Sequence, residues 1–120
     1  MFIEKNVNPY GANIDDCVIR AISLTLNIPY YDVFDELCEL ADKLDYTVNS
    51  FGVFKVYLDN HGYECRVMEE KMTVKQFSQK FYKGKYLLLV NGHMTTCICG
   101  NIYDTWNPSR YKVQFLWVVK

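Results

Sequence analysis

The spacing of apolar residues predicts helices in the first half of the chain. Val18, Ile22 and Leu26 recur every four residues, which is the spacing of one helix face, and this predicts a helix over residues 16–27. Further apolar residues widen the stripe, so we expect this helix to be buried on more than one side. The turn-forming letters "NIP" are expected to end it.

Two further helices are predicted to follow. The segment 30–45 places apolar residues at helical spacing between charged ones, which predicts an amphipathic helix. The segment 49–62 is expected to form a third helix, capped by Asn49 or Ser50 and ended by Gly62. The apolar face of the amphipathic helix consists of Val33, Phe34, Leu37, Leu40, Ala41 and Leu44.

Strand-like segments replace the helical spacing in the second half. A strand is predicted over 63–69, followed by a short helix over 73–84 with Thr73 as its N-cap and Gly84 at its end. Turn signals then separate four segments that are rich in aliphatic and aromatic residues. These predicted strands cover residues 85–91, 93–100, 101–106 and 111–119.

The order of the elements predicts the fold class. Asn91-Gly92 and Gly100-Asn101 are two-residue hairpin signals, so the strands that they join are expected to pair antiparallel. Helices followed by strands predict an α+β fold, with N-terminal helices packed on a C-terminal antiparallel sheet. The length fits a single domain, residues 1–120.

Composition and charge narrow the choice of partners. Half of the residues are hydrophobic and 16% are aromatic, which suffices for a core without disulfides or metal. The formal net charge is -1 and no basic block occurs, which argues against nucleic-acid binding. No apolar run approaches the roughly 20 residues that span a bilayer, and the first residues lack a signal-peptide pattern. We therefore expect a cytoplasmic location and no membrane partner.

The five cysteines are expected to be free thiols, since no export signal accompanies them. Cys97 and Cys99 form a C-x-C pair instead of the C-x-x-C zinc signature, so no metal or other cofactor is expected. A zinc site built from Cys97, Cys99, His93 and one distant cysteine stays open as an alternative. Cys38, Cys97 and Cys99 are otherwise expected to pack in the core, the last two on one face of their strand.

Cys17 has a different setting, because the letters "DDC" place it where the first helix is expected to begin. Free N–H groups and the positive end of the helix dipole favour a thiolate there. Asp15 and Asp16 suit helix capping, but their charges oppose a thiolate, so a cationic partner is needed. Arg20 is expected to pair with Asp16 or elsewhere in the fold, and binding of a substrate carboxylate is its alternative role.

Two histidines are available as the cationic partner of Cys17. His61 is expected at the solvent-exposed end of the third helix. His93 follows a strand and the Asn91-Gly92 turn, so it is expected in a fixed position at the start of the next strand. Asp104 lies on the returning strand, where its carboxylate is expected to orient the imidazole of His93. The alternative for Asp104 is an Asx turn that leads into the letters "NP".

The segments "DDCVIRAIS", "NGHMTTCICG" and "IYDTWNPS" follow one another in an order that resembles the papain-like cysteine peptidase superfamily. The nearest branch is that of the small bacteriocin-leader-peptidase-like proteins. The resemblance covers most of the chain and implies a papain-like core in which Cys17 is the nucleophile, His93 the general base and then acid, and Asp104 the residue that orients His93. The "YDTW" segment resembles the Asn-Ser-Trp of papain, which implies that Trp106 shields the site from water.

One part of the family's pattern is missing from this sequence. The family places a glutamine several residues before the cysteine, where its amide helps to hold the oxyanion, and no glutamine precedes Cys17. Asn13 carries the same amide on a shorter stem, so we expect Asn13 and the Cys17 N–H to form the oxyanion hole. Loss of one such donor typically costs about 100- to 1000-fold in rate, so an Asn13 that does not reach would leave a slow or inactive enzyme.

Together, the residues and the resemblance predict a thiol hydrolase that acts on a peptide or protein substrate through a thioester, as a peptidase, amidase or isopeptidase. A catalytically inactive papain-like binding module is the alternative. The small single domain is typical of proteins from compact genomes such as those of phages. The same site also suits transfer to an amine, and the sequence favours no oligomeric state.

Overall fold

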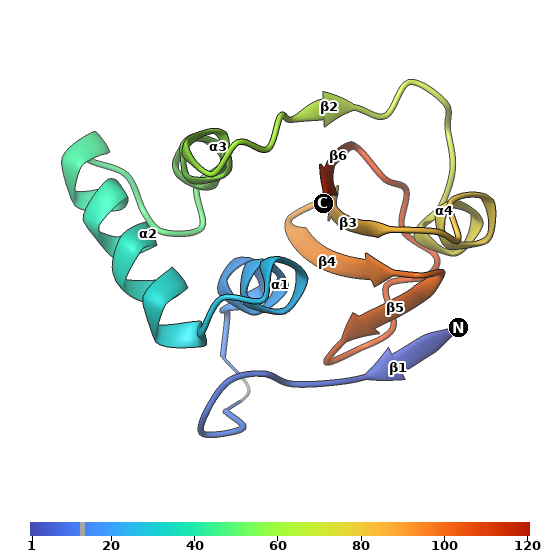
Figure 1. The fold of residues 1–120 in the computed structure, drawn as a ribbon, viewed down its shortest axis with the longest axis horizontal. Coiled ribbons are helices and arrows are strands. Elements are labelled where there is room, and N and C mark those ends of the chain that lie inside the picture. The colour runs from blue at the N-terminus through green and yellow to red at the C-terminus, as the bar shows by residue number, and fades with distance from the viewer. Residues whose placement is uncertain (13) are drawn as a thin grey trace.

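A computed structural model describes residues 1–12 and 14–120 of the chain. Four helices pack on one six-stranded sheet, so the α+β class expected from the sequence is confirmed (Figure 1). The helices are α1 (Cys17–Leu26), α2 (Tyr30–Leu44), α3 (Phe51–Asn60) and α4 (Val74–Lys80). The strands are β1 (Phe2–Glu4), β2 (Arg66–Val67), β3 (Lys85–Val90), β4 (His93–Ile98), β5 (Asn101–Asp104) and β6 (Phe115–Val119).

The sheet is mixed, whereas the sequence predicted an antiparallel one. Its strand order is β1-β5-β4-β3-β6-β2, and β1 pairs parallel with β5, with Phe2 opposite Ile102. The remaining neighbours pair antiparallel. The sequence did not indicate β1, because three residues are too few to show an alternating pattern. The predicted strand over 63–69 is reduced to the two residues of β2.

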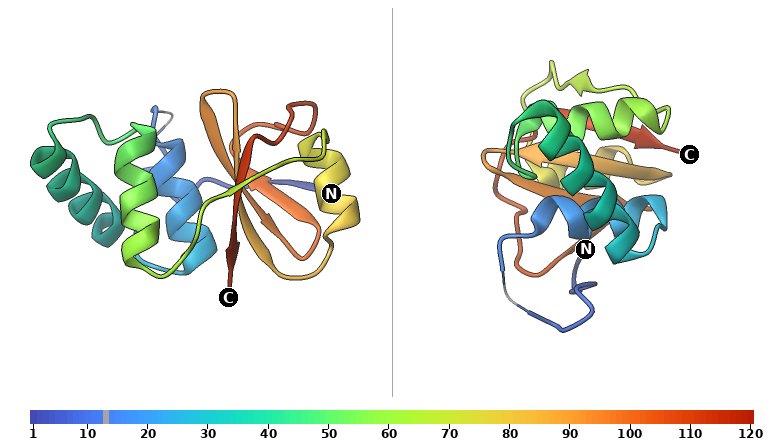
Figure 2. Two further views of the ribbon diagram at one scale, coloured as in Figure 1. Left: turned by 90° about the horizontal axis from the view of Figure 1, so that it is seen from above. Right: turned by 90° about the vertical axis from the view of Figure 1, so that its left-hand side faces the viewer.

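The sheet lies between two layers of helices, with α1, α2 and α3 on one side and α4 on the other (Figure 2). Side chains along each strand point alternately to the two faces of the sheet, so the strands contribute residues to a hydrophobic core on each face. On β3, Leu87 packs with the α1–α3 side, whereas its neighbour Leu88 packs with the α4 side. Trp117 is buried on the first side and Ile102 on the second. Because α1 packs on β4 and β3, the start of this helix is held against the sheet.

The buried face of α2 is narrower than predicted. Val33, Leu37 and Ala41 are buried, but Phe34 and Leu44 are 40% and 38% exposed. The position of the helix explains this difference, because α2 packs mainly on α1 and α3 and lies far from the sheet (Figures 1 and 2). A helix in an outer layer needs only a stripe of apolar residues on its inner side.

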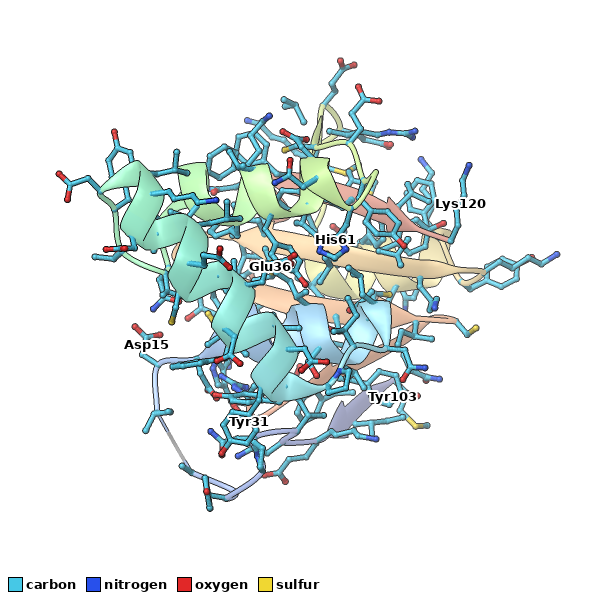
Figure 3. All side chains as sticks on the ribbon, turned by 60° about the vertical axis from the view of Figure 1, so that its left-hand side comes forward. Asp15, Tyr31, Glu36, His61, Tyr103 and Lys120 are labelled. Carbon is cyan, nitrogen blue, oxygen red and sulfur yellow. The ribbon has the colours of Figure 1, made fainter. Side chains whose placement is uncertain are left out.

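His61 links α3 to α2 at the end of the third helix. Its Nε2 lies 2.6 Å from Oε2 of Glu36, and the two side chains point toward each other (Figure 3). The imidazole also stacks on Tyr57, with a ring-centroid distance of 4.3 Å. These contacts give His61 a place in the packing of the two helices, which leaves His93 as the histidine near Cys17.

Several helix ends follow the signals in the sequence. Thr73 is the N-cap of α4 and forms a capping box with Gln76, as expected of this residue type. Asn27 ends α1 in the left-handed conformation, with φ of 56°. Gly84 does not end α4, which stops at Lys80. Gly84 lies instead in the turn before β3, where its φ is +91°.

Two hairpin turns position the strands that carry His93 and Asp104. The predicted "NG" turn joins β3 to β4. The following turn is shifted by one residue, because Cys99 and Gly100, both with positive φ, join β4 to β5. Cys99 is therefore exposed and does not share a buried strand face with Cys97, as the sequence had predicted. A Cβ at residue 100 would lie 3.3 Å from the backbone oxygen of Ser78, which explains the glycine.

Candidate active site

Cys17 is the first residue of α1, and only 7% of it is exposed. Asp16 occupies the N-cap position, but its side chain accepts no capping hydrogen bond from a backbone N–H of the helix, which corrects the expectation that it caps α1. The thiol lies in the first helical turn, where free N–H groups and the helix dipole favour a negative charge.

His93 and Asp104 meet where the β4–β5 hairpin opens. His93 begins β4 and Asp104 ends β5, and the register of the two strands places Thr96 opposite Tyr103. The end of β5 therefore lies beside the start of β4. His93 Nε2 lies 2.6 Å from Asp104 Oδ2, and both residues are buried.

Cys17 lies beside the same imidazole, close enough to act on the pKa of His93, and both residues line one cleft, so the structure brings all three residues together. Because Nε2 of His93 is engaged by Asp104, Nδ1 is the ring nitrogen left for the thiol. Burial disfavours the charged imidazole, but hydrogen bonds to Asp104 and Cys17, together with their charges, raise the pKa of His93 to about 9. At neutral pH the imidazole is therefore protonated, and a cation lies beside the Cys17 thiol.

Trp106 packs on the imidazole of His93, with a ring-centroid distance of 4.5 Å. Tyr111 meets the indole edge-on at 5.6 Å. Trp106 remains 42% exposed, so one part of the ring covers His93 while another part faces solvent. This position suits the shielding role that the resemblance implied for Trp106.

The cluster formed by Cys17, His93 and Asp104 borders a cleft with a volume of about 230 Å³. Cys17 and His93 both line this cleft, so a carbonyl group that enters it reaches the thiol and the imidazole together. The rings of Phe51 and Phe54, from α3, form an apolar part of the wall. Polar groups are supplied by Asp15, Asn49 and Gln114.

Asp16 is buried, and three donors surround its carboxylate. Arg20 Nε lies 2.5 Å from Oδ1, while the Tyr30 hydroxyl and Asn8 Nδ2 donate to Oδ2 at 2.7 and 3.0 Å. Burial would raise the pKa of Asp16, but these hydrogen bonds and the charge of Arg20 lower it below its usual value. The ion pair with Asp16 was one of the alternatives that the sequence left open for Arg20. Asn8 and Tyr30 were missed, since each belongs to a local turn or helix pattern that encodes no distant partner.

Three other predictions about the site concern Asn13, a zinc ion and the remaining cysteines. Asn13, the expected oxyanion donor, lies outside the described residues. In the described part of the chain, no group of three or more His, Cys, Asp or Glu side chains is placed to hold a metal ion, so the zinc site that the sequence left open has no support there. Cys97 is buried as expected, and burial raises its pKa to about 11. Cys38 is only partly buried, in keeping with the narrow inner face of α2.

Comparisons of the chain with models of protein families, with curated proteins and with solved structures found no match. Within residues 1–12 and 14–120, no helix has the length and apolar character needed to cross a membrane. A proposal about function therefore rests on the geometry of the cluster formed by Cys17, His93 and Asp104.

Proposed function

We propose that the protein is a thiol hydrolase with a papain-like core, in which Cys17, His93 and Asp104 form a catalytic triad. The contact of 2.6 Å between His93 Nε2 and Asp104 Oδ2, with Cys17 beside the same ring, carries this proposal. A thiol, an imidazole and a carboxylate in series are the groups that covalent acyl transfer requires. They come from α1, β4 and β5 and meet beside a cleft.

Acylation starts from a Cys17 thiolate and a His93 imidazolium. The sulfur attacks the carbonyl carbon of a peptide, amide or isopeptide bond, and the π electrons of the carbonyl move to its oxygen. When this tetrahedral intermediate collapses, the C–N bond breaks and Nδ1–H of His93 gives its proton to the leaving amine. A thioester on Cys17 and a neutral His93 remain.

Deacylation uses the same groups in reverse. Neutral His93 takes a proton from water as the water oxygen attacks the thioester carbonyl, and the C–S bond then breaks. The carboxylic acid product leaves, and the thiolate–imidazolium pair is restored. Asp104 accepts from Nε2–H throughout, which keeps Nδ1 turned toward the sulfur and stabilises the imidazolium.

We expect the Cys17 N–H to hold the oxyanion of both tetrahedral intermediates, and Asn13 stays the second donor that the sequence predicts. The apolar wall of Phe51 and Phe54 suits an apolar side chain of a peptide or protein substrate. We propose that this substrate is cytoplasmic. Trp106 limits access of water to the His93–Asp104 pair.

Selective alkylation of Cys17 tests this proposal. At about pH 6, iodoacetamide should modify Cys17 at least tenfold faster than the other cysteines, because an ordinary thiol is less than about 1% thiolate at that pH. Burial raises the pKa of Cys38, Cys65 and Cys97, which further slows their reaction. The rates are measured by quenching aliquots and mapping each modified peptide by mass spectrometry.

Cys99 is the internal control for access, because it is exposed whereas Cys17 is buried. Labelling that follows exposure, with Cys99 fastest and Cys17 among the slow thiols, would mean that no ion pair activates Cys17. The inactive papain-like binding module would then replace the hydrolase as the better account.

A further inference from the structure

The chain places a carboxylate directly before the proposed nucleophile. Asp16 precedes Cys17, and negative charge close to a thiol opposes formation of a thiolate. The imidazolium of His93 is already paired with Asp104. The charge of Asp16 therefore requires a further cation, which the three residues of the triad do not supply.

Arg20 supplies this cation one helical turn after Asp16. The two side chains form an ion pair in which only 11% of the arginine and 3% of the aspartate side chain are exposed. Solvent and salt screen a buried pair far less than a surface pair, so the charge of Arg20 offsets that of Asp16 at close range. Tyr30 and Asn8 hold the other oxygen of the Asp16 carboxylate, which keeps this carboxylate in the ion pair.

The same guanidinium also reaches the triad. Arg20 Nη1 donates to Thr105 Oγ1 at 3.1 Å and lies 3.5 Å from Asp104 Oδ1. The Thr105 N–H donates to the same Asp104 oxygen at 2.8 Å. Asp104 is thus held on both oxygens, Oδ2 by His93 and Oδ1 by Thr105 and Arg20. The planar fork of arginine is suited to join two carboxylates, whereas lysine carries a compact point charge.

We propose that Arg20 is a positioning residue for the triad, which links Asp16 to Asp104 and makes the charge of Asp16 compatible with a thiolate at Cys17. This inference rests on the proposed function. The Arg20 side chain then has two tasks, since its charge offsets that of Asp16 and its Nη1 edge supports the carboxylate of Asp104. The charged groups placed around Cys17 by the elements packed there are Lys5, Asp15, Asp16, Arg20, His93 and Asp104.

Variants that remove single charges separate this role from a merely structural one. Asp16→Asn removes a negative charge and should move the pH profile of Cys17 alkylation to lower pH, by about half a pH unit. Arg20→Gln removes the compensating positive charge and should move the profile to higher pH by a similar amount. The double variant removes both charges and should return the profile to its wild-type position. The profile is the rate of iodoacetamide modification of Cys17 across about pH 4 to 9.

Two further variants test whether the shape of the side chain at position 20, or the loss of a positive charge elsewhere in the protein, shifts the profile. Arg20→Lys keeps the charge and should leave the position of the profile unchanged. Lys55→Gln breaks the exposed i,i+4 ion pair of Lys55 with Asp59 on α3, whose atoms lie 2.9 Å apart, and should also cause no shift. Circular dichroism checks folding, because loss of one partner from a buried ion pair destabilises a protein strongly. If Arg20→Gln does not fold, Asp16→Asn and the charge-free double variant carry the test.

Opposite shifts that cancel in the double variant support the role of Arg20. An unshifted or upward-shifted profile in Asp16→Asn, or a double variant that stays displaced, would overturn that role. In either case, selective alkylation of wild-type Cys17 would leave the hydrolase proposal standing. Absence of selective alkylation in the wild type would overturn both proposals together.

Discussion

Replacement of His93 by alanine should slow acylation of Cys17 by about 100-fold, which is typical of a lost acid–base partner. The variant lacks the imidazolium that favours a thiolate on the adjacent sulfur, so at neutral pH most of the thiol is unreactive. Acylation can be measured with p-nitrophenyl acetate, because the burst of nitrophenolate reports transfer of the acetyl group to sulfur and requires no particular peptide sequence. Stopped-flow absorbance at about pH 7 gives the rate.

His61→Ala is the matched control for this experiment. It removes the only other histidine, which contacts Glu36 between α2 and α3, and it should leave the burst rate close to that of the wild type. Cys17→Ala should abolish the burst. An undiminished burst in His93→Ala would show that the imidazole does not activate the sulfur, whatever the distance between them.

The pH dependence of stability should carry a second large signature of His93. Its pKa is raised to about 9 in the folded protein, above the value of 6.5 for an unperturbed imidazole. The imidazole of His93 therefore binds its proton more tightly in the folded protein than in the unfolded chain. The resulting stability is fully present below about pH 6.5 and is lost as the pH rises through 9. We expect this residue to lower the free energy of unfolding by up to roughly 3 kcal/mol across that range, with one part of the effect due to Asp104 and the other to Cys17.

Urea unfolding of Cys17→Ala and of Cys17→Ala/His93→Ala at several values between about pH 6 and 9.5 measures this effect, because in the wild type the Cys17 thiol titrates together with His93. Burial raises the pKa of Cys38, Cys65 and Cys97, so these thiols also weaken the fold toward high pH, but they do so in both proteins. The relevant quantity is the difference in unfolding free energy between the two proteins, which should shrink as the pH rises. A difference that stays constant over the range would rule out a raised pKa for His93 in the folded protein.

Features that follow from short sequence patterns were predicted well. The "NG" turn fixes where β4 begins, and the short return along β5 brings Asp104 beside His93, so a hairpin alone encodes this contact. The capping box at Thr73 is likewise contained within four residues. In each case, the interacting groups lie close together along the chain.

Features that depend on distant partners were predicted poorly. β1 is defined by its pairing with β5 at the other end of the chain, and its three residues carry no pattern of their own. Phe34 was assigned to a buried face because its spacing is helical, but whether it is buried depends on how far α2 lies from the sheet. Asp16 was expected to cap α1, yet it binds Tyr30 and Asn8, which only the tertiary structure brings to it.

Labelling with an electrophilic peptide probe for cysteine hydrolases, such as a peptide vinyl sulfone, tests whether Cys17 and His93 act together on a bound peptide. Such a probe reacts only where an activated thiolate and a proton donor meet a bound peptide backbone. We expect one covalent adduct per chain, which peptide mapping places on Cys17, and loss of this adduct in His93→Ala. An adduct on another cysteine, or none on wild-type protein whose fold is intact, would contradict it.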